Sequence, residues 1–199
     1  MKRVELMIGE GLLDARAGFR LLQSLDVPID PVRCIDKGGS GAFWRDAPKY
    51  DAMARNDGIV LALTDLDRAP CPSGLISQRL GRAPSARFLL RIAARKIESW
   101  LIADAGNLAL YFGVRWQKVP SNPDSLPDPK QALVNLARQS RLRSIREDVV
   151  PEPGSSAPVG KNYVRVMESF IEQHWDPLGA SANSRSLARA INAIQRMAA

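Results

Sequence analysis

Two carboxylates, two residues apart, follow a strongly apolar run in the first third of the chain. Residues 58–64 read Gly-Ile-Val-Leu-Ala-Leu-Thr, and Asp65-Leu66-Asp67 comes directly after them. Such a run predicts a strand that is buried on both faces of a parallel sheet, and ligands of open α/β sheets bind at the carboxyl ends of the strands. Residues i and i+2 of an extended backbone point the same way, so we expect Asp65 and Asp67 to face one point. Paired carboxylates suit Mg²⁺ or Mn²⁺; the alternative is a helix cap or Asx turn that closes the strand.

A second acidic element lies near the N-terminus. The segment Val4–Ile8 predicts another strand, Gly9-Glu10-Gly11 follows it, and apolar residues at spacings of three and four predict a helix over Asp14–Leu25. If the two strands are parallel neighbours, Glu10 lies at the same sheet edge as the Asp-x-Asp pair. Asp14 is one helical turn beyond Glu10 and can share its side of the helix.

These motifs together resemble the Toprim domain, in which a first strand ends in Glu-Gly and a later strand ends in Asp-x-Asp. The stretch 91–104, Arg-Ile-Ala-Ala-Arg-Lys-Ile-Glu-Ser-Trp-Leu-Ile-Ala-Asp, looks similar to a signature of uncharacterised bacterial Toprim-like proteins, which are related to overcoming-lysogenization-defect nucleases. The resemblance extends from about Lys2 to Arg189. It implies a parallel sheet of about four strands flanked by helices, with a metal-dependent activity on nucleic acid.

Glu98 directly follows a further predicted strand, Ala86–Ala94, and therefore belongs to the same edge. It is a candidate metal ligand or acid–base group, or alternatively a first-turn Glu that the helix dipole stabilises. The candidate catalytic residues are Glu10, Asp65, Asp67 and Glu98. The candidate metal ligands are Glu10, Asp14, Asp65 and Asp67.

The chain has 199 residues, a formal net charge of +7, two cysteines and one histidine. A basic protein attracts phosphate polymers. The basic residues of this chain gather in short stretches, which could either bind nucleic acid or form an ordinary solvated surface. The sequence shows no signal peptide, membrane span or disulfide framework, so we expect a cytoplasmic protein with no membrane partner. The candidate nucleic-acid contacts are Arg91, Arg95, Lys96, Lys130, Arg138, Arg141, Arg143 and Lys161, and Arg138–Arg146 could line one helical face.

The remaining elements predict an α/β core over residues 1–112 and a helical extension over residues 113–199 that packs on the core. The other strand of the core is expected at Pro31–Ile35. Further core helices are expected at Pro48–Arg55, from a turn at Pro70–Gly74 with Ser73 as N-cap through Leu80, and from about Lys96. Cys71 is expected to be a small buried thiol. The helices of the extension are expected at about 130–139, 162–175 and 185–197.

The function that these features favour is Mg²⁺- or Mn²⁺-dependent cleavage of phosphodiester bonds in nucleic acid. The alternative from another class is a non-catalytic Toprim-like module of a bacterial defence or mobile-element system. Such a module would bind nucleic acid or a protein partner encoded nearby. A third alternative is a nucleotide-binding enzyme that uses the Gly-rich segment Lys37–Gly41.

Overall fold

A four-stranded parallel sheet forms the centre of the chain in the computed structural model, which describes residues 2–56 and 58–198. The strands are β1 (Val4–Gly9), β2 (Cys34–Asp36), β3 (Ile59–Asp65) and β4 (Phe88–Ala93), in the spatial order β2-β1-β3-β4. All neighbouring pairs are parallel, with Gly9 opposite Leu63 in the β1–β3 pair. The expected α/β class and four-stranded parallel sheet are therefore confirmed.

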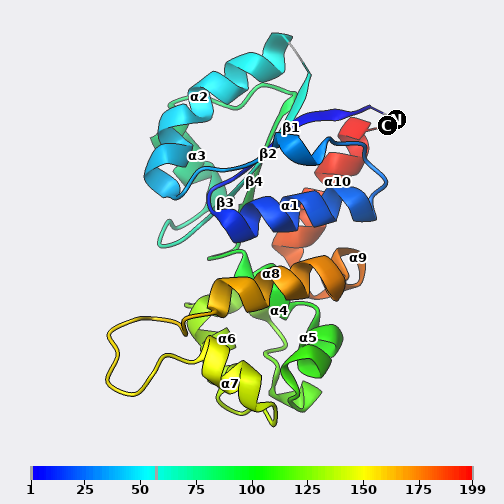
Figure 1. Cartoon of the computed structure of the whole chain (residues 1–199). Coiled ribbons are helices and arrows are strands. Elements are labelled where there is room, and N and C mark those ends of the chain that lie inside the picture. The colour runs from blue at the N-terminus through cyan, green and yellow to red at the C-terminus, as the bar shows by residue number, and fades with distance from the viewer. Residues whose placement is uncertain (1, 57, 199) are drawn as a thin grey trace.

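Successive residues of the central strands pack against different layers, as the period of two requires. On β3, Leu61 and Leu63 join the core on one face, whereas Val60 and Ala62 join the core on the other. The first face is covered by α1 (Leu12–Ser24) and α10 (Arg185–Ala198), and the second by α2 (Ser40–Asn56) and α3 (Pro72–Leu80). This three-layer arrangement leaves the carboxyl ends of the strands uncovered by the flanking helices (Figure 1).

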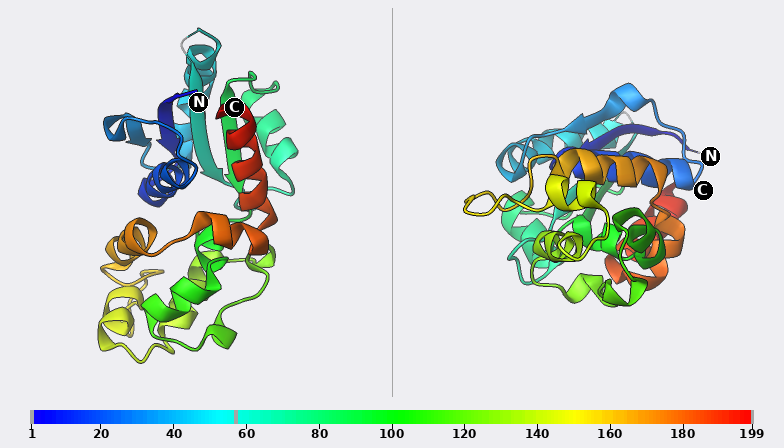
Figure 2. Two further views of the ribbon diagram at one scale, coloured as in Figure 1. Left: turned by 90° about the vertical axis from the view of Figure 1, so that its right-hand side faces the viewer. Right: turned by 60° about the horizontal axis from the view of Figure 1, so that its bottom comes forward.

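A group of short helices lies beyond that carboxyl edge (Figures 1 and 2). Its core is continuous with the core on the α1 side of the sheet, so the helices complete one packed body. The chain then returns to the sheet through α10, which packs on β4. The remaining α-helices are α4 (Glu98–Ile102), α5 (Ala105–Phe112), α6 (Pro129–Ala137), α7 (Arg143–Val149), α8 (Tyr163–Gln173) and α9 (Pro177–Ala180).

Several expected boundaries were wrong. The expected strand Pro31–Ile35 begins instead with a short 3₁₀ turn, and β2 starts at Cys34. Helix α2 begins at Ser40, eight residues before the expected start, and Pro48 lies inside it. Proline favours the first turn of a helix, but the buried residues Phe43, Trp44 and Ala47 precede it and hold the earlier turns against the sheet.

The start of α3 also differs from the expectation. Its N-cap is Cys71, whose Sγ accepts from the Gly74 N–H, and Ser73 lies in the first turn. Cys71 is exposed, so the expectation of a buried thiol was wrong as well. The chain ends lie together: the Lys2 N–H donates to the Ala198 carbonyl at 3.0 Å. Within the described residues, no helix is long and apolar enough to span a membrane.

Candidate functional site

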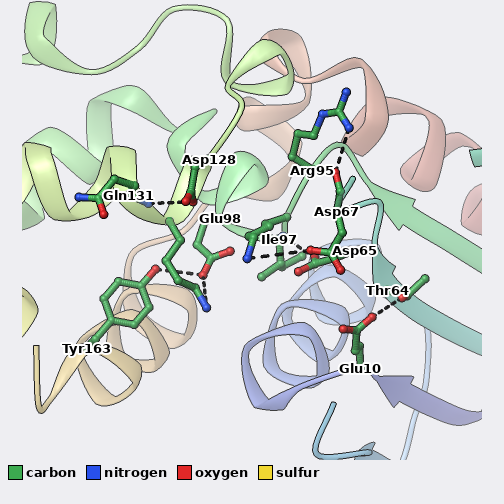
Figure 3. Close-up of polar contacts among 12 residues, drawn as sticks. Glu10, Thr64, Asp65, Asp67, Arg95, Ile97, Glu98, Asp128, Gln131 and Tyr163 are labelled. Carbon is green, nitrogen blue, oxygen red and sulfur yellow. Dashed lines mark hydrogen bonds and ion pairs between the residues drawn. The ribbon is translucent and has the colours of Figure 1, made fainter. Parts of the chain in front are cut away.

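The ends of β1 and β3 are joined by two hydrogen bonds at the carboxyl edge of the sheet. The Glu10 N–H donates to the Leu63 carbonyl at 2.9 Å, and the Thr64 hydroxyl donates to Glu10 Oε2 at 2.5 Å (Figure 3). Thr64 is fully buried, so this hydroxyl fixes the Glu10 carboxylate from inside the fold. Glu10 and Asp65 consequently lie at the same edge.

Asp65 connects the end of β3 to the turn before α4. Its Oδ1 accepts from the Ile97 N–H at 2.8 Å, and Glu98 is the next residue (Figure 3). One backbone hydrogen bond therefore brings a carboxylate of β3 and a carboxylate of α4 to the same place. The sequence position of Glu98, directly after β4 and its turn, correctly indicated this edge.

Asp14 reaches the cluster from the first turn of α1. The side chain is 6% exposed, and its Oδ2 accepts from the Gly11 N–H at 3.0 Å. Its Oδ1 is buried without a hydrogen-bond partner. A buried carboxylate oxygen that lacks a donor is costly, and the charges of Glu98 and Glu10 add to the effect of burial in raising the pKa of this carboxyl.

Glu98 is buried against the helices beyond the sheet edge. The Tyr163 hydroxyl donates to its Oε1 at 3.0 Å, and Lys130 Nζ lies 3.5 Å from the same oxygen. Tyr163 begins α8, and it is itself 2% exposed. Sequence reasoning gave Tyr163 no role in this site, because the carboxylate that its hydroxyl contacts lies 65 positions earlier in the chain. It also missed the contact between Thr64 and Glu10, although a hydroxyl at the end of an apolar strand indicates a polar partner at that strand end.

The carboxylates of this cluster interact electrostatically. Burial, followed by the charges of Asp14, Glu98 and Glu10, raises the pKa of Asp65 to about 9. Burial is also the main reason that the pKa of Asp14 lies well above its ordinary value and that the pKa of Glu10 is raised. The four groups thus repel one another in a poorly solvated place, which is the situation that a bound cation relieves.

Asp51 provides the comparison within the same protein. It is fully buried in α2, but Arg55 and Arg82 pair with it and the Ser85 N–H donates to it at 2.7 Å. Burial opposes its ionisation, yet the Ser85 donors and the Arg82 charge lower its pKa overall. No such ion pair reaches Glu10, Asp14 or Asp65 among the described residues. Asp51 thus has two cationic partners, whereas Glu10, Asp14 and Asp65 have none among the described residues.

Asp67 is placed differently from the expectation. Strand β3 ends at Asp65, and Asp67 has a left-handed backbone with φ of 48°. The extended geometry that would align it with Asp65 is therefore absent, and that premise was wrong. The Asp67 side chain is 49% exposed, with Lys96 Nζ 3.9 Å from its Oδ1. Its charge is nevertheless close enough to Glu10 to raise the pKa of that carboxyl.

A pocket of about 630 Å³ opens beside this edge. Asp65 and Asp67 line it together with the basic residues Arg68, Arg79 and Lys96. Two carboxylates beside three cations give a hollow that can accept an anionic ligand next to a bound metal ion.

The basic residues proposed from the sequence fall into separate places. Lys96 and Lys130 lie at the acidic cluster. Arg95 stabilises the turn after β3, because its guanidinium donates hydrogen bonds to the carbonyls of Asp67 and Ala69. Arg91 is a partly buried residue of β4, and its Nε is buried without a partner.

The second basic stretch does not share one helical face, so that expectation was wrong. Arg138 follows the last residue of α6, Arg141 lies in the connection, and Arg143 begins α7. Arg143 pairs with Glu147 at 2.7 Å. Lys161 is exposed near the long loop that precedes α8.

The side chains, as they stand, do not form a ready-made metal site. Within residues 2–56 and 58–198, no three His, Cys, Asp or Glu side chains are arranged to hold a metal ion. The carboxylates are instead turned to Thr64, to the Ile97 N–H and to Tyr163.

A search among known proteins gave no significant match to a family model, a curated protein or a solved structure.

Proposed function

We propose that this protein is a divalent-metal-dependent phosphodiesterase that acts on nucleic acid, with a Toprim-like core. The observation that carries the proposal is the convergence of Glu10, Asp14, Asp65 and Glu98 from four different elements, three of them without a cationic partner. An arrangement that costs stability is expected where function requires it. The unpartnered Asp14 Oδ1 and the all-oxygen donor set fit Mg²⁺ or Mn²⁺.

The proposed ligands are Glu10, Asp65 and Asp67, with Asp14 and Glu98 completing the surroundings of the site. A bound divalent ion supplies a Lewis acid for the phosphate and lowers the pKa of a bound water. Binding requires that the carboxylates rotate away from their present donors.

The cationic groups of the chain have a separate task. Lys96, Arg68 and Arg79 line the pocket beside Asp65 and Asp67, where they bind the phosphates of a strand and place the scissile bond at the carboxylates. Lys130 Nζ, 3.5 Å from Glu98 Oε1, pairs with that buried carboxylate and orients it.

A non-catalytic module that binds nucleic acid or a protein partner is the second candidate. It is favoured by the present side-chain arrangement, in which no three carboxylates of the described residues hold a metal ion. The two candidates differ in one property that can be measured, namely metal-dependent turnover.

The test is cleavage of end-labelled single- and double-stranded DNA and RNA with Mg²⁺, with Mn²⁺ and with EDTA. We expect cleavage only with metal, and a loss on the order of a hundredfold in Asp67→Asn, because this change removes charge and almost no volume. Asp26→Asn is the matched control, since Asp26 is also an exposed Asp with a left-handed backbone (φ of 53°) and lies away from the strand ends. Absence of cleavage with every metal and substrate, or full activity in Asp67→Asn, favours the non-catalytic module.

A further inference from the structure

An exposed tryptophan lies in the helical part of the molecule, on the turn that follows α5. Trp116 is 65% exposed, whereas Trp44, Trp100 and Trp175 are at most 6% exposed. Leu110, on the last turns of α5, is 77% exposed. Both side chains line one hollow of about 680 Å³. Two large apolar side chains that share a surface hollow indicate a binding surface.

The charge around this hollow is uniformly positive. Arg115 lines it, and an adjoining hollow of about 320 Å³ adds Arg141 while sharing Leu110, Val114 and Arg115. No Asp or Glu lines either hollow. Among the described residues, neither arginine takes part in an ion pair, in contrast to Arg143 nearby. Both guanidinium groups are therefore available to an anionic ligand.

The backbone beneath the surface is fixed. Trp116 opens a 3₁₀ turn in which the Val119 N–H donates to the Trp116 carbonyl at 3.0 Å, and Val119 is buried. The Arg141 N–H donates to the Gly113 carbonyl at 3.1 Å, which ties the second arginine to the end of α5. The aromatic ring and the two cations thus extend from backbone that is already fixed, so ligand binding requires little ordering of the chain.

We propose that Leu110, Val114, Arg115, Trp116 and Arg141, together called the Trp116 surface, bind single-stranded nucleic acid. A base stacks on Trp116, and the flanking phosphates contact Arg115 and Arg141. Gln117 lines the first hollow and Gln139 the second. A duplex is excluded from this mode because its bases are already stacked and paired. A protein partner is less well matched, because it would need carboxylates at these two particular positions, whereas every nucleotide carries a phosphate.

The inference goes beyond the proposed function, since it concerns binding and holds whether or not the acidic cluster cleaves anything. Its test therefore measures binding in EDTA, where no metal-dependent cleavage occurs. The probes are fluorescein-labelled dT₁₂, U₁₂ and a twelve-base-pair duplex, followed by anisotropy and by quenching of the intrinsic tryptophan fluorescence.

We expect both single strands to bind more tightly than the duplex and to quench the fluorescence of the one exposed tryptophan. Trp116→Ala should weaken binding by roughly tenfold, while Trp116→Phe, which keeps a stacking ring, should stay within about threefold of the wild type. Leu178→Ala, which removes a 45% exposed leucine from α9, is the matched control and should change nothing. The double change Arg115→Gln and Arg141→Gln should make the log–log salt slope shallower by about one to one and a half.

Three results would overturn the inference. The first is no measurable affinity of the wild type for dT₁₂ or U₁₂. The second is an unchanged affinity in Trp116→Ala that retains the wild-type Tm. The third is a dimer in sedimentation that Trp116→Ala dissociates while oligonucleotide binding stays the same, which would assign this surface to a second copy of the chain.

Discussion

Replacing Asp65 by Asn is expected to stabilise the metal-free protein at neutral pH. Burial, followed by the charges of Asp14, Glu98 and Glu10, raises the pKa of Asp65 to about 9 from its ordinary value of 3.8. Between these two values the unfolded chain has released a proton that the folded chain keeps, so the stability of the wild type falls as the pH rises through this window. Asn removes this dependence, and its Oδ1 retains the capacity to accept from the Ile97 N–H.

The size of the effect follows from the same pKa. One pH unit corresponds to about 1.36 kcal/mol per proton, so keeping Asp65 protonated at pH 7 costs at most about 4 kcal/mol. We expect Asp65→Asn to raise the free energy of unfolding by about 2–4 kcal/mol at pH 7 in EDTA. For a chain of this length, such a gain corresponds to a rise in Tm of about 5–15 °C. At pH 3.5 the gain should nearly vanish.

The assay is urea and thermal unfolding of both proteins from pH 3.5 to 8, first in EDTA and then with saturating Mg²⁺. Because a ligand stabilises the folded state that binds it, Mg²⁺ should raise the Tm of the wild type and have little effect on Asp65→Asn. Asp67→Asn is the control in EDTA: its side chain is half exposed, so its stability should lie within about 0.5 kcal/mol of the wild type. A variant that is less stable than the wild type in EDTA at pH 7, or that keeps the wild-type pH dependence, would refute the picture of a strained acidic cluster.

Three further outcomes follow from other contacts. Tyr163→Phe should cost about 1–3 kcal/mol of unfolding free energy in urea, because it leaves a buried carboxylate without its hydroxyl donor. Asp51→Ala should cost about 3 kcal/mol or more, the opposite sign to Asp65→Asn, because it removes the partner of two arginines; a stable variant would contradict this. In salt titrations of oligonucleotide binding, neutralising Arg138, Arg141 and Arg143 together should flatten the slope, and Arg141→Gln alone should account for most of the change because Arg143 already has an ion pair.

The sheet and its acidic edge were accessible from the sequence because strong local patterns encode them. The apolar run of β3 predicts a doubly buried strand. Asp65 is its last residue, Glu10 follows β1, and Glu98 follows β4 after a short turn. Parallel order then brings these three to one edge, as the pairings of Gly9 with Leu63 and of Asp65 with Ala93 show. Asp14 was accessible for a similar reason, since helical periodicity places it one turn after Glu10.

The rest depends on contacts between distant segments or on local backbone detail. Tyr163 meets Glu98 only because the helices beyond the sheet fold back over the carboxyl edge. The left-handed turn at Asp67 redirects its side chain, and period-two reasoning has no means to foresee it. The exposure of Trp116 likewise follows from the packing of α5 and its turn; a tryptophan in an isolated sequence is more simply assigned to a core.

The central claim, that the strand-end carboxylates hold a divalent ion, is tested most directly by anomalous diffraction from crystals soaked in Mn²⁺. The account predicts an anomalous peak within about 2.5 Å of an Asp65 carboxyl oxygen and of an oxygen from Glu10 or Asp67. It also predicts that the peak disappears in Asp65→Asn crystals treated in the same way. Mn²⁺ peaks elsewhere on the molecule, with none among these carboxylates, would contradict the account.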